Sequence, residues 1–468
     1  MSTQPTVVVA GGGLAGLVAA RHLAGAGADV TLFERRDEVG GRVRTLERDG
    51  YRFDRGFQVL FTGYPAVQRE LDLEGLDLRR FNPGAVIARA NHRSTLSDPL
   101  RDPKSGLATT LNPDVTFRDS VRVLKLRRRL GKRDPDTLFS GSDASISEYL
   151  RELGFSKRFV ENFAAPFYGG ITLDRSLSTS KRVFEYTFRT LSKSDIAVPA
   201  EGMAAIPKQL ADAARSEGVS IRTGRTVTAI EGGADGSALS GDEPDESAVA
   251  EDEPDESVVA DDEPDESTGI ADGESDELAV VVDGESVRAD AVVVATDPPT
   301  ARKLTGLESI PIEARSCVTQ YYALPADTDL ETGKRLLLNA ADDDGPNHVV
   351  PQSEVASTYA PNDVTLVSAT YLGEREESDE ELAILTRRTL EAWYPERVFG
   401  RFDLLHTDRI EFAQFAQPPG IHEDLPGPRD AGDGVYLAGD YTQWSSIQGA
   451  MESGREAARA VISDLDAT

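Results

Sequence analysis

Residues 7–17 read Val-Val-Val-Ala-Gly-Gly-Gly-Leu-Ala-Gly-Leu, and a second apolar run, Asp-Val-Thr-Leu-Phe-Glu, follows at 29–34. Residues 6–10 predict a short buried strand. Residues 14–26 predict a helix, which Gly27 is placed to end. Two strands joined by a helix within about 30 residues pair in parallel. The N-terminus therefore predicts an α/β, Rossmann-like domain.

The glycines of this stretch follow the spacing Gly11-x-Gly13-x-x-Gly16 at the turn from strand to helix. Gly11 permits the tight turn, Gly13 lets the backbone approach a pyrophosphate, and Gly16 lets the helix pack closely on the strand. Glu34 ends the next strand, 21 residues after Gly13. A carboxylate there accepts both ribose hydroxyl protons and repels a 2′-phosphate, so the pattern predicts a dinucleotide other than NADP.

A second glycine turn, Gly40-Gly41-Arg42, begins six residues after Glu34. Two glycines let the backbone wrap around a diphosphate, and the arginine donates hydrogen bonds to it. This turn favours a flavin dinucleotide over a nicotinamide one.

The composition excludes several classes of protein. The net charge is −31, so nucleic acid binding is disfavoured. The single cysteine, Cys317, excludes an intrachain disulfide and a thiolate cluster, and the five scattered histidines predict no metal site. The basic residues are 41 Arg and only 9 Lys, which is typical of a protein from a high-salt cytoplasm or of a GC-rich genome.

No apolar run reaches the roughly 18 residues of a membrane-spanning helix. The apolar N-terminus has no preceding basic residue and is broken by glycines, so it predicts no signal peptide. We expect a cytoplasmic protein with at most peripheral membrane contact; the oligomeric state is left open.

Residues 232–277 contain 19 Asp or Glu and no Lys or Arg. Within them Asp-Glu-Pro-Asp-Glu-Ser occurs three times, at 242–247, 252–257 and 262–267. A segment with this charge and no aromatic residue is predicted to be disordered. It is interpreted either as an interaction or salt-solvating segment or as a surface insertion that the fold tolerates.

The order of patterns predicts a discontinuous nucleotide domain with an interleaved α+β substrate domain. The nucleotide domain takes residues 1–77, 201–300 and 421–468, with 233–277 as its acidic insert. The substrate domain takes residues 78–200 and 301–420. Further strands are expected at 219–222, 226–231, 278–283, 291–296, 365–371 and 435–438, and helices at 121–130, 380–393 and 447–465.

Taken together, residues 7–17, Glu34-Arg35 and Gly40-Gly41-Arg42 resemble the flavin-containing amine oxidase and phytoene desaturase superfamily. The C-terminal runs Tyr-Leu-Ala-Gly-Asp-Tyr-Thr (436–442) and Ser-Ile-Gln-Gly-Ala-Met-Glu-Ser-Gly (446–454) are most similar to the plant and cyanobacterial phytoene desaturases, as is the run at 56–68. The resemblance implies a bound FAD.

The resemblance also implies a role for each matching residue. Gly439 and Asp440 hold the ribityl and pyrophosphate region, and Gln448, Gly449 and Ala450 open the last helix beneath the flavin. Gly56, Phe57 and Gln58 lie near the isoalloxazine, and Val227 touches the adenine. Ser445 and Gln448 are spaced as a capping box. The full expected set is Gly11, Gly13, Leu14, Ala15, Gly16, Glu34, Arg35, Gly40, Gly41, Arg42, Gly56, Phe57, Gln58, Val227, Gly439, Asp440, Gln448, Gly449 and Ala450.

The sequence also departs from the amine oxidases. No cysteine follows Cys317, so the FAD is expected to be non-covalent. Lys303 lies one residue from the place of the lysine that holds a water in many amine oxidases, and is either a catalytic candidate or a surface residue. Tyr441 and Trp444 are either a cage for an amine or packing residues.

We expect an FAD-dependent oxidoreductase that passes a hydride from an apolar, isoprenoid or carotenoid-like substrate to flavin N5, as a desaturase or isomerase. The alternatives are an amine oxidase and a non-catalytic or redox-sensing flavoprotein. The electron acceptor is a quinone or oxygen. The apolar run at 163–173 is a hydrocarbon tunnel or ordinary core, and the basic stretch 122–133 meets anionic lipid or pairs with neighbouring carboxylates.

Overall fold

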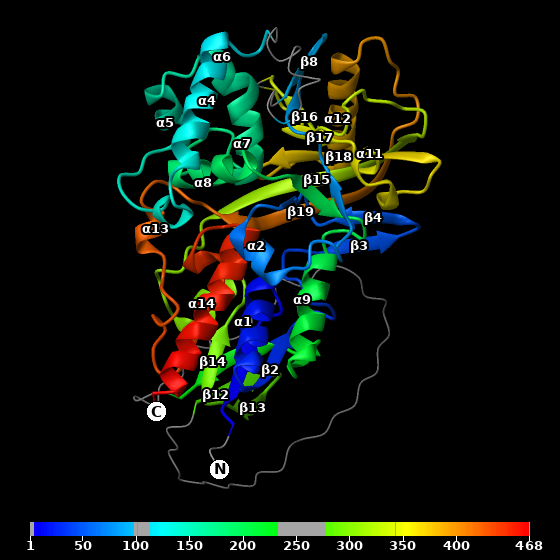
Figure 1. Cartoon of the computed structure of the whole chain (residues 1–468). Helices are drawn as coiled ribbons and strands as arrows, with labels where there is room; N and C mark the ends of the chain where they lie inside the picture. The colour runs from blue at the N-terminus through cyan, green and yellow to red at the C-terminus, as the bar shows by residue number, and fades with distance from the viewer. Residues whose placement is uncertain (1–3, 98–100, 102–112, 233–277, 342, 468) are drawn as a thin grey trace.

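The computed structural model describes residues 4–97, 101, 113–232, 278–341 and 343–467. The acidic repeats lie outside these residues. Figure 1 shows the described elements in two layers, with the parallel sheet and the chain termini at one end and the larger sheet at the other.

The first layer is a parallel five-stranded sheet in the order β10-β2-β1-β14-β20. Its strands are β1 (Thr6–Ala10), β2 (Asp29–Glu34), β10 (Ser220–Thr223), β14 (Ala291–Val294) and β20 (Val435–Leu437). The central strands β1 and β14 carry near-continuous Val, as strands buried on both faces do, whereas the edge strand β10 is mostly exposed. The predicted parallel strand–helix–strand unit is confirmed.

Three helices accompany this sheet: α1 (Leu14–Gly25), α9 (Ala205–Ser216) and α14 (Ile447–Leu465). Helices α1 and α14 pack in close contact. Gly454 of α14 permits this approach, since a Cβ at that position would overlap the Ala15 carbonyl oxygen of α1. Gly27 adopts φ +100° just after α1, as expected for a residue that ends a helix.

A small antiparallel sheet lies beside the parallel one. Strand β11 (Val227–Glu231) pairs with β12 (Ala279–Val282), which pairs with β13 (Glu285–Arg288). The acidic segment therefore connects two paired neighbouring strands, as predicted. Helix α10 (Pro298–Thr305) follows β14.

The second layer is a seven-stranded mixed sheet in the order β19-β15-β18-β17-β16-β7-β8. Helix α12 (Asp379–Trp393) packs on it through Leu390 and Trp393. The strands are β7 (Ala85–Arg89), β8 (His92–Leu96), β15 (Ala314–Pro325), β16 (Leu337–Asn339), β17 (His348–Val350), β18 (Val364–Leu372) and β19 (Asp403–Phe415).

A group of helices flanks this second sheet. They are α4 (Phe117–Gly131), α5 (Ile146–Glu152), α6 (Lys157–Phe159), a π-helical turn (Val160–Ala164), α7 (Ala165–Thr172) and α8 (Lys181–Leu191). Strands β5 (Leu60–Phe61), β9 (Ile196–Pro199) and β6 (Leu78–Arg80) form a further small sheet. This small sheet pairs one strand from the predicted nucleotide segments with two strands from the predicted insertion.

The chain between β2 and β5 carries the hairpin β3 (Thr45–Arg48) and β4 (Tyr51–Asp54), and α2 (Pro65–Glu70) follows β5. Asp54 ties this region to the rest. It is buried, and its carboxylate accepts hydrogen bonds from Thr45, from the Met203 amide and from the Tyr359 hydroxyl.

Candidate active site

A cavity of about 610 Å³ runs from the carboxyl end of the parallel sheet toward the seven-stranded sheet. Residues that directly follow β2, β14 and β20 contribute to one end of it. Ligands of open α/β sheets bind at the carboxyl ends of the strands. The cavity is lined by sixteen of the predicted residues: Gly11, Gly13, Leu14, Ala15, Glu34, Arg35, Gly40, Gly41, Arg42, Gly56, Phe57, Gln58, Val227, Gly439, Asp440 and Ala450.

The three glycines of the first turn meet different constraints. Gly11 adopts φ +110°, and a Cβ there would lie 2.6 Å from the Ala295 carbonyl oxygen. A Cβ on Gly16 would overlap the Gly11 carbonyl oxygen, so Gly16 brings α1 against β1 and does not line the cavity. A Cβ on Gly13 would meet no atom within 4 Å. The space beside Gly13 is therefore open for a ligand.

Glu34 is held rigidly at this end of the cavity. Its side chain is 5% exposed, its Oε2 accepts the Gly12 amide at 2.7 Å and its Oε1 accepts the Arg36 amide at 3.0 Å. Each carboxylate oxygen can accept a second hydrogen bond, so the group can still accept hydrogen bonds from the two hydroxyls of a diol.

Arg42 and Asp440, which both line the cavity, are bound to each other. Arg42 Nη2 donates to Asp440 Oδ1 at 2.6 Å, and Ser445 Oγ donates to Asp440 Oδ2 at 2.8 Å. Gln58 donates to the Arg42 carbonyl at 2.9 Å. The arginine of the N-terminal motif is thus bound directly to the aspartate of the C-terminal motif.

Three further arginines, which sequence reasoning missed, line the cavity near Glu34: Arg36, Arg44 and Arg55. Burial, Arg55 and Arg36 lower the pKa of Arg44 to about 10, and its buried Nε has no partner within the described residues. Burial and Arg35 likewise lower the pKa of Arg36. A bound dianion would relieve this crowding of cations. The high density of arginine in residues 35–55 is the sequence feature that could have predicted these contacts.

The last helix begins one residue later than the predicted capping box requires. Ser446 is its N-cap, and its hydroxyl accepts the Gly449 amide at 2.8 Å. The expected cap, Ser445, is instead bound to Asp440. Gln448 Oε1 accepts the Ala66 amide at 2.8 Å, so Gln448 braces α2 and, like Gly449, does not line the cavity. The positive end of the α14 dipole still reaches the cavity through Ile447 and Ala450.

These features fit a flavin dinucleotide. The open space beside Gly13, the crowded arginines, the fixed Glu34 and the helix N-terminus supply the contacts that a ribose, a diphosphate and an electron-rich ring require. Gln58 Oε1 is buried without a partner in the described structure, so it is available to a ligand.

The other end of the cavity is apolar. The side chains there belong to Phe57, Phe61, Tyr64, Pro166, Phe167, Ile171, Val183, Ile196, Leu336 and Leu338. Phe57 packs on His348 with ring centroids 4.9 Å apart. The apolar run at 163–173 was predicted to be either a hydrocarbon tunnel or ordinary core, and its residues are of both kinds. Phe167 and Ile171 line the cavity, whereas Ala164 is buried and does not.

His348 is the one titratable imidazole that lines the cavity among the described residues. The Asn347 side-chain nitrogen donates to the Pro166 carbonyl, and its side-chain oxygen accepts from Arg175. These two contacts fix the orientation of the Asn347 amide. Its nitrogen, which lies 3.1 Å from His348 Nδ1, is therefore the donor in that hydrogen bond. The His348 proton therefore lies on Nε2, which is buried without a partner in the described structure. Burial lowers the pKa of His348 to about 4, so the ring is neutral near pH 7.

Lys303 lies on α10, where Ala301, Leu304 and Thr305 face the core. Its side chain is exposed and does not line the cavity. The helix turns Lys303 outward, so we do not retain it as a catalytic candidate.

The aromatic pair near the C-terminus does not form an amine cage. Tyr441 is buried, donates to the Val294 carbonyl at 3.0 Å and is a packing residue. Trp444 lines the cavity, where it meets Tyr64 edge-on at 6.0 Å.

Cys317 is distant in sequence from the C-terminal motif but lines the cavity. Burial raises the pKa of its thiol to about 12. The thiolate is the reactive form of cysteine, so the group is unreactive at neutral pH.

Among the described residues, no group of three or more His, Cys, Asp or Glu side chains is arranged to hold a metal ion. No described helix combines the length and hydropathy that crossing a bilayer demands.

Known proteins resemble this chain in fold and sequence. A phytoene dehydrogenase of Streptomyces griseus is 30% identical over 49% of this chain and 50% of its own length. A carotenoid 3,4-desaturase of Haloarcula japonica is 58% identical, over 11% of this chain and 10% of its own length. The chain thus matches about half the length of the first relative and a tenth of the second.

Solved structures show the same fold at low identity. An oxidoreductase from Methanosarcina mazei aligns with a TM-score of 0.67 and 16% identity, over 98% of this chain and 100% of that one. A putrescine oxidase bound to putrescine aligns with a TM-score of 0.65 and 16% identity, over the full length of both chains.

The family model described as "Flavin containing amine oxidoreductase" matches residues 14–252 and 267–462. These ranges take in the second glycine turn, the Arg42–Asp440 pair and most of the last helix, and begin just after Gly11 and Gly13 of the first turn. The chain therefore belongs to the flavin-containing amine oxidoreductase family.

Proposed function

We propose that this protein is an FAD-dependent oxidoreductase that acts on an apolar, isoprenoid or carotenoid-like substrate, as a desaturase or isomerase. The observation that carries the proposal is the apolar end of the cavity. Its wall is aliphatic and aromatic, and its one imidazole, His348, is neutral near pH 7. The names of the two curated relatives, phytoene dehydrogenase and carotenoid 3,4-desaturase, support the same class of substrate.

The residues divide by role in this proposal. Glu34 binds the adenosine ribose, and the arginines that line the cavity near Glu34 neutralise the diphosphate. Asp440, oriented by Arg42 and Ser445, holds the ribityl chain. The N-terminus of α14 stabilises negative charge at the ring end of the cavity. The flavin, when bound, supplies the chemistry by accepting a hydride from a substrate carbon.

The chain's other contribution is to position the substrate and keep water away from it. Phe57 and Phe167 flank an extended hydrocarbon, and the His348 Nε2 proton is available to a polar substrate group. Excluding water protects the reactive carbon until its proton is lost. Electrons leave to a quinone or to oxygen in this proposal.

We also propose the division of labour between the two layers. Segments 1–77, 201–300 and 421–468 bind the cofactor, and segments 78–200 and 301–420 bind the substrate. The FAD is held without a covalent bond, because the Cys317 thiol is protonated at neutral pH.

Amine oxidation is the alternative, since a putrescine oxidase shares the fold and an L-amino-acid oxidase of Pseudechis australis is 39% identical over 22% of this chain. A cationic amine in the apolar end would need a carboxylate or a pair of facing aromatic rings. The carboxylates that line the cavity are Glu34, Asp297, Glu411 and Asp440. Glu34, Asp297 and Asp440 are bound by Gly12, Arg35 and Arg42, which leaves Glu411 as the carboxylate that an amine would use. Trp444 and Tyr64 meet edge-on and do not face each other.

Anaerobic reduction of the bound flavin tests the proposal. The purified protein is mixed in high salt with phytoene-like polyenes and, separately, with a panel of amines, and loss of the yellow flavin colour is followed. Bleaching by a polyene supports the proposal, whereas bleaching by amines alone establishes the alternative. Failure of the purified protein to hold flavin contradicts both.

A further inference from the structure

Helix α4 exposes an apolar stripe to solvent. Phe117 is 77% exposed, Val121 36% and Leu124 39%. Their spacing of four and three residues places them on one face of the helix. They are three of the seven large hydrophobic side chains that are exposed in the described structure, so the stripe is a local concentration of exposed apolar surface.

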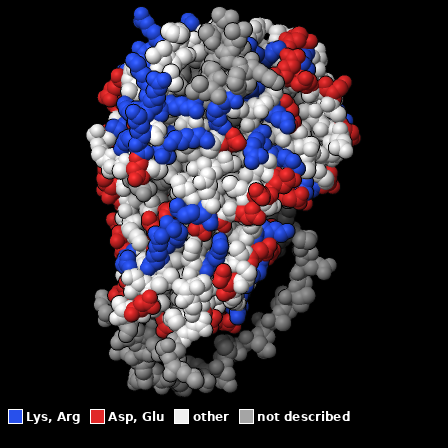
Figure 2. Space-filling view, in the orientation of Figure 1, with Lys and Arg blue, Asp and Glu red and all other residues white. Residues whose placement is uncertain are grey.

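The same helix carries the densest positive charge of this acidic chain. Residues 117–133 hold eight Lys or Arg and one acidic residue, Asp119, which is buried in the N-terminal capping box. Figure 2 shows these basic side chains gathered at the upper left, over α4. Four of them are exposed and form no ion pair within the described residues: Arg118, Lys125, Arg128 and Lys132.

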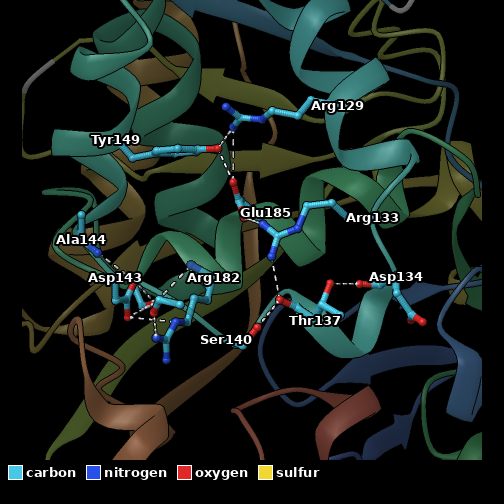
Figure 3. Close-up of polar contacts among 12 residues, drawn as sticks. Arg129, Arg133, Asp134, Thr137, Ser140, Asp143, Ala144, Tyr149, Arg182 and Glu185 are labelled. Carbon is cyan, nitrogen blue, oxygen red and sulfur yellow. Dashed lines mark hydrogen bonds and ion pairs between the residues drawn. The ribbon is translucent and has the colours of Figure 1, made fainter.

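Arg129 of α4, and Arg133 just after the helix, are turned toward a carboxylate of the neighbouring helix. Arg133 pairs with the buried Glu185 of α8 at 2.9 Å, and Arg129 pairs with the same carboxylate at 3.4 Å. Tyr149 of α5 donates to Glu185 as well, as Figure 3 shows. Leu126 and Leu130 are buried on the inner side. Pairing with Glu185 therefore accounts for Arg129 and Arg133, whereas Arg118, Lys125, Arg128 and Lys132 form no ion pair within the described residues.

A row of aromatic rings leads from the start of α4 to the cavity. Ser156, next to Phe155, donates its amide to Asp119 of α4 at 2.9 Å. From Phe155 to Phe159, Phe163 and Phe167 the successive ring centroids are 4.6, 5.5 and 5.2 Å apart. Phe167 lines the apolar end of the cavity. The aromatic row thus runs from beside the N-terminus of α4 to the cavity.

We propose that α4 docks the protein on the surface of an anionic lipid bilayer. Phe117, Val121 and Leu124 enter the boundary between headgroups and acyl chains, while Arg118, Lys125, Arg128 and Lys132 contact lipid phosphates. Exposed apolar side chains flanked by cations are the pattern of interfacial helices. Charge complementarity selects a polyanionic surface as the occupant, and the apolar stripe selects lipid over a purely polar polyanion.

Vesicle co-sedimentation of the flavin-loaded protein tests this surface. The probes are vesicles of phosphatidylglycerol mixed with phosphatidylcholine, and vesicles of phosphatidylcholine alone. We expect the wild type to sediment with the anionic vesicles and to remain in the supernatant with the neutral ones. Higher salt weakens the interaction, because it screens the exposed charges.

Two double variants separate the contributions of charge and stripe. Lys125→Glu with Arg128→Glu, and Phe117→Ser with Leu124→Ser, each lower binding to anionic vesicles by on the order of tenfold. The matched controls change exposed residues elsewhere, Lys208→Glu with Arg388→Glu and Ile384→Ser with Val398→Ser, and bind as the wild type does. Retained flavin colour shows that each variant is folded.

Two results overturn the proposal. One is a wild type that stays in the supernatant with both kinds of vesicle. That result would indicate an acidic protein, and not a lipid surface, as the partner of the exposed face of α4. The other is a pair of α4 variants that bind as tightly as their controls. Because sedimentation does not depend on the substrate, its outcome is distinguishable from failure of the proposed oxidation.

Discussion

Arg42 donates to Asp440 at 2.6 Å across a sequence separation of 398 residues. Asp440 is 3% exposed, and its second oxygen accepts from Ser445. This pair fastens the N-terminal glycine turn to the residues that precede the last helix. The cofactor end of the cavity is therefore complete only when both ends of the chain have folded together.

We predict that Asp440→Ala abolishes flavin binding at micromolar concentrations. The change leaves Arg42 partly buried without its anion, a loss that costs about 3–5 kcal/mol where a buried pair is broken. Flavin content after gel filtration and the urea midpoint measure the two consequences. Asp464→Ala removes an exposed ion pair with Arg429 and serves as the control that keeps its flavin. An Asp440→Ala protein that purifies with full flavin would falsify this role.

Substitutions at two glycines are expected to separate binding from folding. Gly13→Ala adds a methyl group to open space in the ligand-free chain, so the fold is retained and the flavin is lost. Gly16→Ala forces α1 away from β1, because its Cβ would overlap the Gly11 carbonyl oxygen, and overpacking of this kind costs about 1–3 kcal/mol. Circular dichroism and flavin content distinguish the two. Equal unfolding midpoints for both variants would contradict the assignment of Gly16 as a packing residue.

His348 gives stability a defined dependence on pH. Its pKa is lowered to about 4 by burial, whereas an unfolded histidine titrates near pH 6.5. Between these values the unfolded chain binds a proton that the folded chain does not, so the free energy of unfolding falls as pH decreases. Above pH 6.5 this contribution is constant. We predict that the free energy of unfolding falls by about 2 kcal/mol less between pH 7 and pH 5 in His348→Gln than in the wild type, as measured by urea unfolding. Identical pH slopes in the variant and the wild type would show that His348 does not titrate in this way.

The flavin is expected to leave the chain on denaturation. Cys317 lines the cavity, but its thiol has a pKa of about 12 and stays protonated. Acid precipitation should therefore release yellow flavin into the supernatant from the wild type and from Cys317→Ala alike. Flavin that precipitates with the wild type and is freed only in the variant would establish a covalent bond.

The nucleotide-binding half was predictable because its signals are local. A buried strand, a glycine turn, a helix and Glu34 follow one another within the first 34 residues, and each acts on its neighbours in the chain. The same holds for the last helix, whose predicted bounds agree with Ile447–Leu465. Propensity and hydrophobic pattern carry enough information for such units.

The apolar end of the cavity depends on contacts that no local pattern encodes. His348 reaches it through the register of β17 beside β16, and its tautomer is set by Asn347, Pro166 and Arg175. The cap of α14 was misplaced for a similar reason, because Ser445 is drawn to Asp440 by a contact within the folded site. Lys303 had a suggestive sequence position, but burial of its helix neighbours turned it outward.

The most direct test of the central claim is a single anaerobic turnover with product analysis. The flavin-loaded protein is mixed with excess phytoene-like polyene in lipid vesicles, and the loss of flavin colour is compared with the mass of the recovered polyene. For a desaturase we predict one product molecule, lighter by two hydrogens, for each flavin reduced, and for an isomerase a polyene of unchanged mass and altered double-bond geometry. Polyene recovered unchanged beside a flavin that amines reduce, with release of a carbonyl product, would contradict the proposed function.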